Sequence, residues 1–358
     1  MDESISGRVF GRPRLVHVAV GLLVSAGAIW LVFSSVNLGI VLQLLSAAAL
    51  PPLLLLLATL AAQTVIRAIR WSLLLPRRHG RRVPARRTLA PMLVGYLGNA
   101  LLPARLGEPA RALLVARRES LPAAAAFGSV VLERIIDTTT LALLLLPAAW
   151  LLGAPGWILD AALVAAVISG LLLLVLAFTG LGGLVRLGDR IANRLRSNLV
   201  GTAASRLAGL LAEFSSGAEA SDRRPIVVVA ALLSLGAWLL DAGMFWLASA
   251  SLGAPVEPVQ AVVIAAVAVL GTAVPSAPGY VGTYELAATA AAVALGIPAE
   301  QALAVAILVH SLTLIPMAVA GAVALVAIQR EGLSGSRMTG DHDCSGEGDA
   351  SSTVRAAT

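Results

Sequence analysis

Apolar residues run along this chain in stretches that approach the roughly 20 residues a helix needs to cross the hydrocarbon of a bilayer. Short polar or arginine-rich segments separate these stretches. The pattern predicts an all-α polytopic membrane protein. We expect about six full transmembrane helices, over Leu15–Phe33, Val41–Ala62, Ala124–Leu152, Ile158–Thr179, Pro225–Leu252 and Pro298–Ile328.

Two further apolar stretches carry charge and are interrupted by proline and glycine. They read LGNALLPARLGE over Leu97–Glu108 and LGTAVPSAPGYVGTYE over Leu270–Glu285. Backbone that proline and glycine free from helical hydrogen bonding is tolerated inside a membrane only where protein buries it or where it lines a wet cavity. We therefore expect two re-entrant segments, over Thr88–Leu102 and Val259–Leu295, around a polar site within the bilayer.

Each re-entrant segment lies between two predicted spans. Arginines flank the first segment, which places it on the cytoplasmic side, whereas the flanks of the second carry none. The second and third spans with the inner segment then mirror the fifth and sixth spans with the outer segment, in reversed orientation. Such an inverted repeat is typical of transporters with a site near the midplane. The alternative is that both stretches are ordinary kinked spans.

Composition and charge support this class and orient the chain. Hydrophobic residues make up 58% of the sequence, charged residues 13%, and the mean hydropathy is +0.88, which excludes a soluble domain. Arginines collect in cytoplasmic loops, which places Arg67–Arg87 and both termini in the cytoplasm. The net charge of +6 lies beside apolar segments, where anionic lipid headgroups are the nearer partner. We expect a multi-pass protein of the bacterial inner (plasma) membrane and no nucleic-acid partner.

The remaining segments divide the chain into three parts. Residues 1–14 form a cytoplasmic N-terminus, residues 15–328 a transmembrane domain, and residues 329–358 a disordered cytoplasmic tail. Within the domain, residues 185–224 alternate apolar positions with arginine, which predicts either an interfacial amphipathic helix or a solvated linker. The first apolar run is interpreted as a retained anchor rather than a signal peptide. The single cysteine, Cys344, lies in the tail, so we expect no disulfide, metal or cofactor.

Charged residues at membrane depth cost roughly 2.5–3.5 kcal/mol each on insertion scales, so each needs a partner or a function. Arg105, Glu108 and Arg111 are spaced at three along the first broken stretch, close to Asn99. Two guanidinium groups around one carboxylate leave a net positive charge, and arginine forks match phosphate oxygens. Either these residues bind a lipid phosphate, or they form an internal ion pair that holds the segment shut.

A second charged group lies on the third span. Glu133 and Asp137 are four residues apart and share a helix face, with Arg134 beside them. These carboxylates are either a proton-coupling pair or counter-ions of Arg105 and Arg111.

The second half of the chain carries further polar candidates. Tyr280, Tyr284 and Glu285 lie beside glycines of the outer segment and could bind a headgroup, although an interfacial aromatic belt also explains the tyrosines. His310 is a candidate proton relay or a packed histidine. Asp241, isolated in the fifth span, needs a partner or a proton.

Three of these segments together resemble one known family. GNALLPARLGEPAR from Gly98, ERIID from Glu133 and PSAPGYVGTYE from Pro275 are similar to the lysylphosphatidylglycerol synthase transmembrane-region family, also called flippase-like domain proteins. The resemblance covers residues 15–328. In synthases of this family, such a domain accompanies a soluble aminoacyltransferase domain and is thought to flip the product lipid. The matching soluble domain is missing here, so aminoacyl transfer by this chain alone is not expected.

The resemblance implies a lipid translocase for an anionic, aminoacylated or glycosylated lipid, with no cofactor. Some relatives are linked to sugar transfer from polyprenyl phosphate, which leaves an integral-membrane transferase as an alternative. A non-transporting partner subunit of a lipid-modifying enzyme is a third. In each case, membrane lipids of the anionic or polyprenyl-phosphate type are the expected partners.

Overall fold

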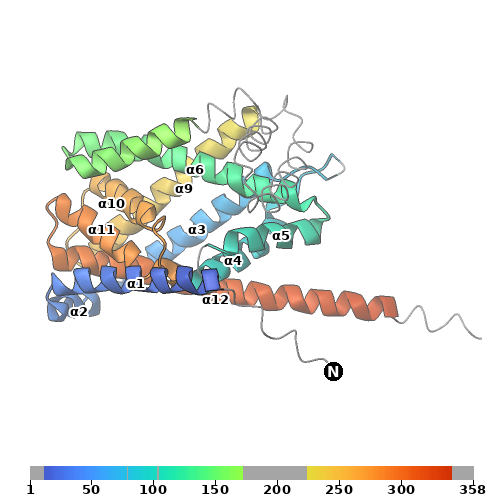
Figure 1. Ribbon diagram of the computed structural model, residues 1–358, viewed down its shortest axis with the longest axis horizontal. Coiled ribbons are helices and arrows are strands. Elements are labelled where there is room, and N and C mark those ends of the chain that lie inside the picture. The colour runs from blue at the N-terminus through green and yellow to red at the C-terminus, as the bar shows by residue number, and fades with distance from the viewer. Residues whose placement is uncertain (1–11, 79, 103–104, 172–223, 341–358) are drawn as a thin grey trace, which may run out of the picture.

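The computed structural model describes residues 12–78, 80–102, 105–171 and 224–340. Every named element within them is helical (Figure 1). The elements are α1 (Arg12–Ser34), α2 (Leu38–Ser46), α3 (Leu50–Leu74), α4 (Ala85–Leu101), α5 (Gly107–Glu119), α6 (Ala123–Leu151), a helix over Gly156–Leu171, α9 (Arg224–Ser251), α10 (Pro258–Gly271), the 3₁₀ turn η1 (Pro278–Tyr280), α11 (Thr283–Ala294) and α12 (Ala299–Gly340).

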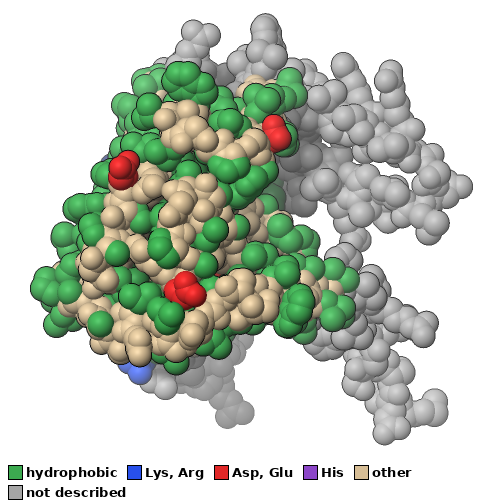
Figure 2. Space-filling view, turned by 90° about the vertical axis from the view of Figure 1, so that its left-hand side faces the viewer, with side chains coloured by type: hydrophobic (Ala, Val, Ile, Leu, Met, Phe, Trp, Pro, Cys, Tyr) green, Lys and Arg blue, Asp and Glu red, His purple; other side chains and the backbone are tan. Residues whose placement is uncertain are grey.

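The all-α membrane fold is confirmed. Among the described helices, α3, α9 and α12 are long and apolar enough to cross a bilayer, and α1 with α2 forms a fourth candidate bent by 88°. Large apolar side chains such as Leu23, Leu143 and Trp150 are at least 70% exposed, as a lipid-facing surface requires. Figure 2 shows hydrophobic side chains over most of the visible described face, with acidic ones only at isolated places. The expected count of six spans stays a prediction.

The second predicted span, Val41–Ala62, has the wrong boundaries. The chain breaks between α2 and α3, because Asn37 caps α2 and the prolines at 51 and 52 occupy the first turn of a new helix. Helix α3 then continues to Leu74. Arg67 and Arg70, which the charge rule placed in a cytoplasmic loop, therefore lie on a helix long enough to cross the membrane.

Both broken stretches form helical hairpins. Helices α4 and α5 pack together as the first, and α10 and α11 as the second. With 17, 13, 14 and 12 residues, the four arms are each shorter than a full crossing, since 14 residues of α-helix span about 21 Å. The described chain thus contains two hairpins of the kind that re-entrant segments form.

The helices pack as an inverted repeat requires. The packing of α3 on α4, α5 on α6 and α4 on α12 has counterparts in α9 on α10, α11 on α12 and α10 on α6. Helices α3 and α9, which begin the two halves, run antiparallel: Ala49 N–H donates to the Ser251 carbonyl (2.7 Å) near one end, and Arg70 contacts Ser234 (2.5 Å) near the other. These two corresponding helices therefore point in opposite directions.

Two other predictions concern the C-terminal tail and the cytoplasmic amphipathic segment. Helix α12 continues to Gly340, so residues 329–340 are helical although a disordered tail was expected from residue 329. Residues 329–331, Gln-Arg-Glu, are good helix formers, and they extend a helix that is already nucleated. The predicted amphipathic segment at 185–224 lies outside the described residues except for its last position, as do residues 172–179 of the fourth span, 1–11 and 341–358.

Candidate functional site

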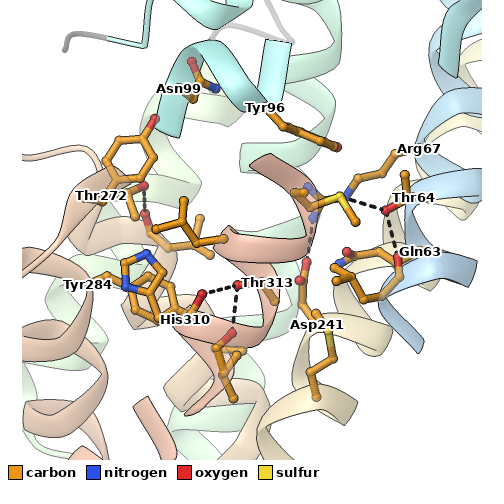
Figure 3. Close-up of a pocket in the computed structure, with 18 of the residues that line it drawn as sticks. Gln63, Thr64, Arg67, Tyr96, Asn99, Asp241, Thr272, Tyr284, His310 and Thr313 are labelled. Carbon is orange, nitrogen blue, oxygen red and sulfur yellow. Dashed lines mark hydrogen bonds and ion pairs between the residues drawn. The ribbon is translucent and has the colours of Figure 1, made fainter. Parts of the chain in front are cut away.

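A cavity of about 260 Å³ lies where the tips of the two hairpins meet α3, α9 and α12 (Figure 3). Its wall includes nine of the twelve residues that the sequence singled out: Asn99, Arg105, Glu108, Arg134, Asp137, Asp241, Tyr280, Tyr284 and His310. The other three, Arg111, Glu133 and Glu285, do not line it but bind residues that do. The structure thus brings together polar groups from both halves of the chain.

The two hairpin tips touch through Arg105. Its guanidinium donates to the Thr272 hydroxyl (2.6 Å) and lies 5.5 Å from the centre of the Tyr280 ring. Both Arg105 (φ 55°) and Tyr280 (φ 61°) have left-handed backbone conformations, which are uncommon for residues other than glycine and concentrate at functional sites. These turns position the two side chains at the junction of the tips.

Behind the tips lies a buried charged cluster on α3, α5 and α6. Arg70, only 1% exposed, binds Glu133 (2.8 Å) and Asp137 and also contacts Ser234 on α9. Arg111 binds Glu108 (2.6 Å) and Glu133 (3.0 Å). Because charges removed from water need paired and hydrogen-bonded neighbours, this network holds the three helices in one arrangement.

Arg111 has a different environment from Arg105, although the sequence suggested that both bind phosphate. The Arg111 side chain is 4% exposed, bonded to two carboxylates and 4.6 Å from the centre of the Trp71 ring. The internal ion pair is therefore the arrangement that the structure shows for Arg111. Glu133 and Asp137 are counter-ions of Arg70, and Glu133 is also a counter-ion of Arg111, as expected, whereas neither pairs with Arg105.

Arg105 differs from the other arginines around the cavity. Arg67, Arg70, Arg111 and Arg134 each have a carboxylate within 4.0 Å, whereas no described carboxylate lies within that distance of Arg105. These five arginines face four carboxylates, those of Glu108, Glu133, Asp137 and Asp241. Glu285, which pairs with His310, is a fifth carboxylate beside the cavity, so these charges balance when His310 is neutral. The guanidinium without an ion-pair partner, that of Arg105, is on the cavity wall.

The opposite wall carries several polar side chains, of which the sequence had singled out only Asp241. Arg67 binds Asp241 (2.6 Å), so the isolated aspartate of α9 has its partner on α3. The Arg67 guanidinium lies 5.5 Å from the centre of the Trp238 ring. Trp238 Nε1 and Arg67 Nε are buried and have no hydrogen-bond partner among the described residues. Figure 3 shows Gln63, Thr64, Arg67 and Asp241 together on this side.

A signal for the missed residues was present in the sequence. Gln63, Arg67 and Arg70 recur at spacings of four and three on an otherwise apolar segment, which places them on one helix face. Such a face, together with unpaired acids on other spans, predicts a buried polar stripe rather than a loop.

His310 lies on the same side of the cavity as Thr272 (Figure 3). Its Nδ1 is 2.5 Å from the Glu285 carboxylate, and its ring centre is 4.4 Å from that of Tyr284. Glu285 also accepts the Gly282 N–H (2.7 Å) at the start of α11. A hydrogen-bonded histidine–carboxylate pair thus connects the second hairpin to α12.

Comparison with known proteins identifies the family. The family model for the lysylphosphatidylglycerol synthase TM region matches residues 18–321. The chain belongs to this family. It is also similar to a protein from Haloferax volcanii named glycosyltransferase AglD, with 29% identity over 337 aligned residues that cover 84% of this chain and 53% of that relative. The chain thus spans about half of the relative's length. The protein is a multi-pass membrane protein of a family related to membrane lipids.

Proposed function

We propose that the protein is a lipid translocase of the bacterial inner membrane, with both termini cytoplasmic, and that it binds the phosphate of an anionic lipid at Arg105. The observation that carries this proposal is the position of Arg105, which lies on the cavity wall with no described carboxylate in ion-pair range. An arginine fork without an internal anion suits the bidentate geometry of a phosphate.

The cavity size limits how a lipid can bind. The cavity has a volume of about 260 Å³. That volume accommodates a small headgroup but not two acyl chains. In the proposed mechanism the headgroup therefore enters the protein while the chains stay in the bilayer.

The contacts between the hairpin tips suggest how the site would open. One hydrogen bond, from Arg105 to Thr272, and one ring contact with Tyr280 connect the charged groups of the two tips. A phosphate would compete with Thr272 for the Arg105 guanidinium and so weaken the closure. Because the hairpins belong to inverted halves, opening one tip and then the other would expose the site to alternate sides of the membrane.

The opposite wall would select the rest of the headgroup. The unpartnered N–H groups of Arg67 and Trp238 are donors, and the Asp241 carboxylate is an acceptor. Such groups suit the amine of an aminoacylated headgroup or the hydroxyls of a glycosylated one.

Transport of fluorescent phosphatidylglycerol tests the proposal. The label is placed on a short acyl chain so that the headgroup remains unmodified. Dithionite bleaches only the outer leaflet of protein-free liposomes, which leaves about half of the signal. We expect wild-type proteoliposomes to lose substantially more than half, and Arg105→Gln to return the loss to half.

Arg118→Gln provides the matched control. Arg118 pairs with the exposed Glu331 and does not line the cavity, so this variant should transport like the wild type. Loss of only half with folded wild-type protein and every lipid tested would contradict the proposal.

The name of the Haloferax volcanii relative favours a second candidate, an integral-membrane transferase acting on a polyprenyl-phosphate-linked sugar. In that case Arg105 would hold the donor phosphate. The same liposomes, supplied with a polyprenyl-phosphate sugar, would then form a glycosylated product. A stable complex with a lipid-modifying enzyme, without transport or transfer by this chain, would instead indicate a partner subunit.

A further inference from the structure

The histidine–carboxylate pair has a defined direction of hydrogen bonding. Both oxygens of Glu285 are occupied as acceptors: one accepts the Gly282 N–H (2.7 Å), and the other is 2.5 Å from His310 Nδ1. A carboxylate in this arrangement needs a donor at Nδ1. The Nδ1–H tautomer is therefore the one that the neutral His310 ring adopts.

This tautomer decides what the other ring nitrogen can do. With the proton of neutral imidazole on Nδ1, Nε2 carries only a lone pair. No described residue makes a hydrogen bond to Nε2, although the ring is 7% exposed and lines the cavity. A phosphate oxygen also offers only lone pairs, so a neutral His310 and a bound phosphate oxygen repel each other. Once Nε2 takes up a proton, it becomes a charged donor.

We propose that His310 is a second phosphate-binding residue of this cavity, which engages the anion only after protonation at Nε2, so that each bound phosphodiester brings one proton into the site. This inference rests on the proposed function, since it adds His310 to the phosphate site built around Arg105. The Glu285 carboxylate is a positioning residue that fixes the ring and neutralises the imidazolium. Release of the anion returns the proton.

The titratable groups around His310 lie on several helices. On α11 they are Glu285 and Tyr284, and on α12 no other ionisable side chain lines the cavity. The rest of the wall carries Asp241 on α9, Arg67 on α3, Tyr96 on α4, Glu108 on α5, and Arg134 and Asp137 on α6, with Tyr280 and Arg105 at the tips. Helices α2 and α10 contain no ionisable side chain. Because binding takes up a proton at Nε2, phosphate binding should weaken as the pH rises.

Calorimetry with dihexanoyl phosphatidylglycerol tests the inference on the full chain in detergent. The phosphodiester does not titrate between pH 6 and 8, so any proton taken up on lipid binding is bound by the protein. Titrations at pH 8 in buffers of different ionisation enthalpy count these protons. We expect uptake of about one proton per lipid and an affinity about tenfold weaker at pH 8 than at pH 6.

Two variants test the His310 ring and the Glu285 carboxylate separately. His310→Gln should bind without proton uptake and with the same affinity at both pH values. Glu285→Gln can donate an amide N–H to Nδ1, which permits a neutral tautomer with a proton on Nε2, so it should retain binding but lose proton uptake.

The outcomes distinguish this inference from the proposed function. Binding that Arg105→Gln abolishes, but that involves no proton uptake in the wild type, would overturn the role of His310 and leave the Arg105 site intact. Proton uptake that persists in His310→Gln would overturn it as well. Absence of any Arg105-dependent binding would overturn both proposals.

Discussion

Replacing Arg70 with glutamine should destabilise the protein more than any other single arginine change in the cavity region. The Arg70 side chain is 1% exposed and binds two carboxylates, of which Glu133 is 2% exposed and Asp137 8%. The variant leaves Asp137 with a hydrogen bond from the Ser234 hydroxyl (3.1 Å) and a 3.5 Å contact to the half-exposed Arg134. Removing one partner of a buried ion pair costs about 3–5 kcal/mol, because the remaining charge stays buried without compensation.

The membrane setting defines the lower limit of this estimate. Individual polar contacts between transmembrane helices average about 0.6 kcal/mol, because the unfolded state in the membrane also finds partners. The loss at Arg70 exceeds such a contact, since a carboxylate at membrane depth that has lost its closest cation costs roughly 2.5 kcal/mol or more. We therefore expect a loss of at least about 2.5 kcal/mol in the free energy of unfolding.

Reversible unfolding by SDS in mixed micelles, followed by tryptophan fluorescence, measures this loss. Arg70→Lys keeps the charge but not the fork, so it should lose about one charge-assisted hydrogen bond, about 1.5–3 kcal/mol. Arg118→Gln, whose pair with Glu331 is exposed, should change stability by less than about 1 kcal/mol. Unfolding of Arg70→Gln at the wild-type SDS fraction would refute the structural role of the cluster.

Three further changes probe the hairpins and their supports with the same assay. Gly107→Ala should cost about 3 kcal/mol or more, because a Cβ there would collide with the Gly95 carbonyl oxygen in the tight α4–α5 hairpin; wild-type stability would contradict this packing. Gly236→Ala in α9, where a Cβ meets nothing within 4 Å, should raise stability by up to about 1 kcal/mol, and a clear loss would show that the space beside Gly236 is not open. Ser25→Ala removes the hydroxyl that accepts the Ala277 N–H (2.8 Å), so stability should fall by about 1 kcal/mol and hydrogen exchange at that amide should quicken; unchanged exchange would show that α1 does not hold the second hairpin.

The sequence predicted the hairpins because their signals are local. Prolines grouped with glycines, as at Pro275, Pro278 and Gly279, favour a break, whereas the single prolines at 91, 147 and 316 lie inside continuous helices. The same reasoning placed charged residues near these breaks, and most of those residues line one cavity in the folded chain.

Pairing between helices was not accessible to the same reasoning. The charge rule placed Arg67 and Arg70 in a cytoplasmic loop. Their partners, Asp241, Glu133 and Asp137, are distant in sequence and come beside them only in the folded chain. Arg105 and Arg111 are each three residues from Glu108, so the spacing alone did not separate them. Arg111 shares helix α5 with Glu108 and pairs with it, and α6 brings Glu133 to Arg111 and not to Arg105.

The central claim is that the cavity between the hairpin tips binds a lipid phosphate at Arg105. Electron cryomicroscopy of the protein in phosphatidylglycerol nanodiscs tests it directly. The account predicts phosphate density within about 3 Å of the Arg105 guanidinium, and its loss in Arg105→Gln. Lipid phosphates seen only around the perimeter of the protein, with the cavity empty of lipid density, would contradict the claim.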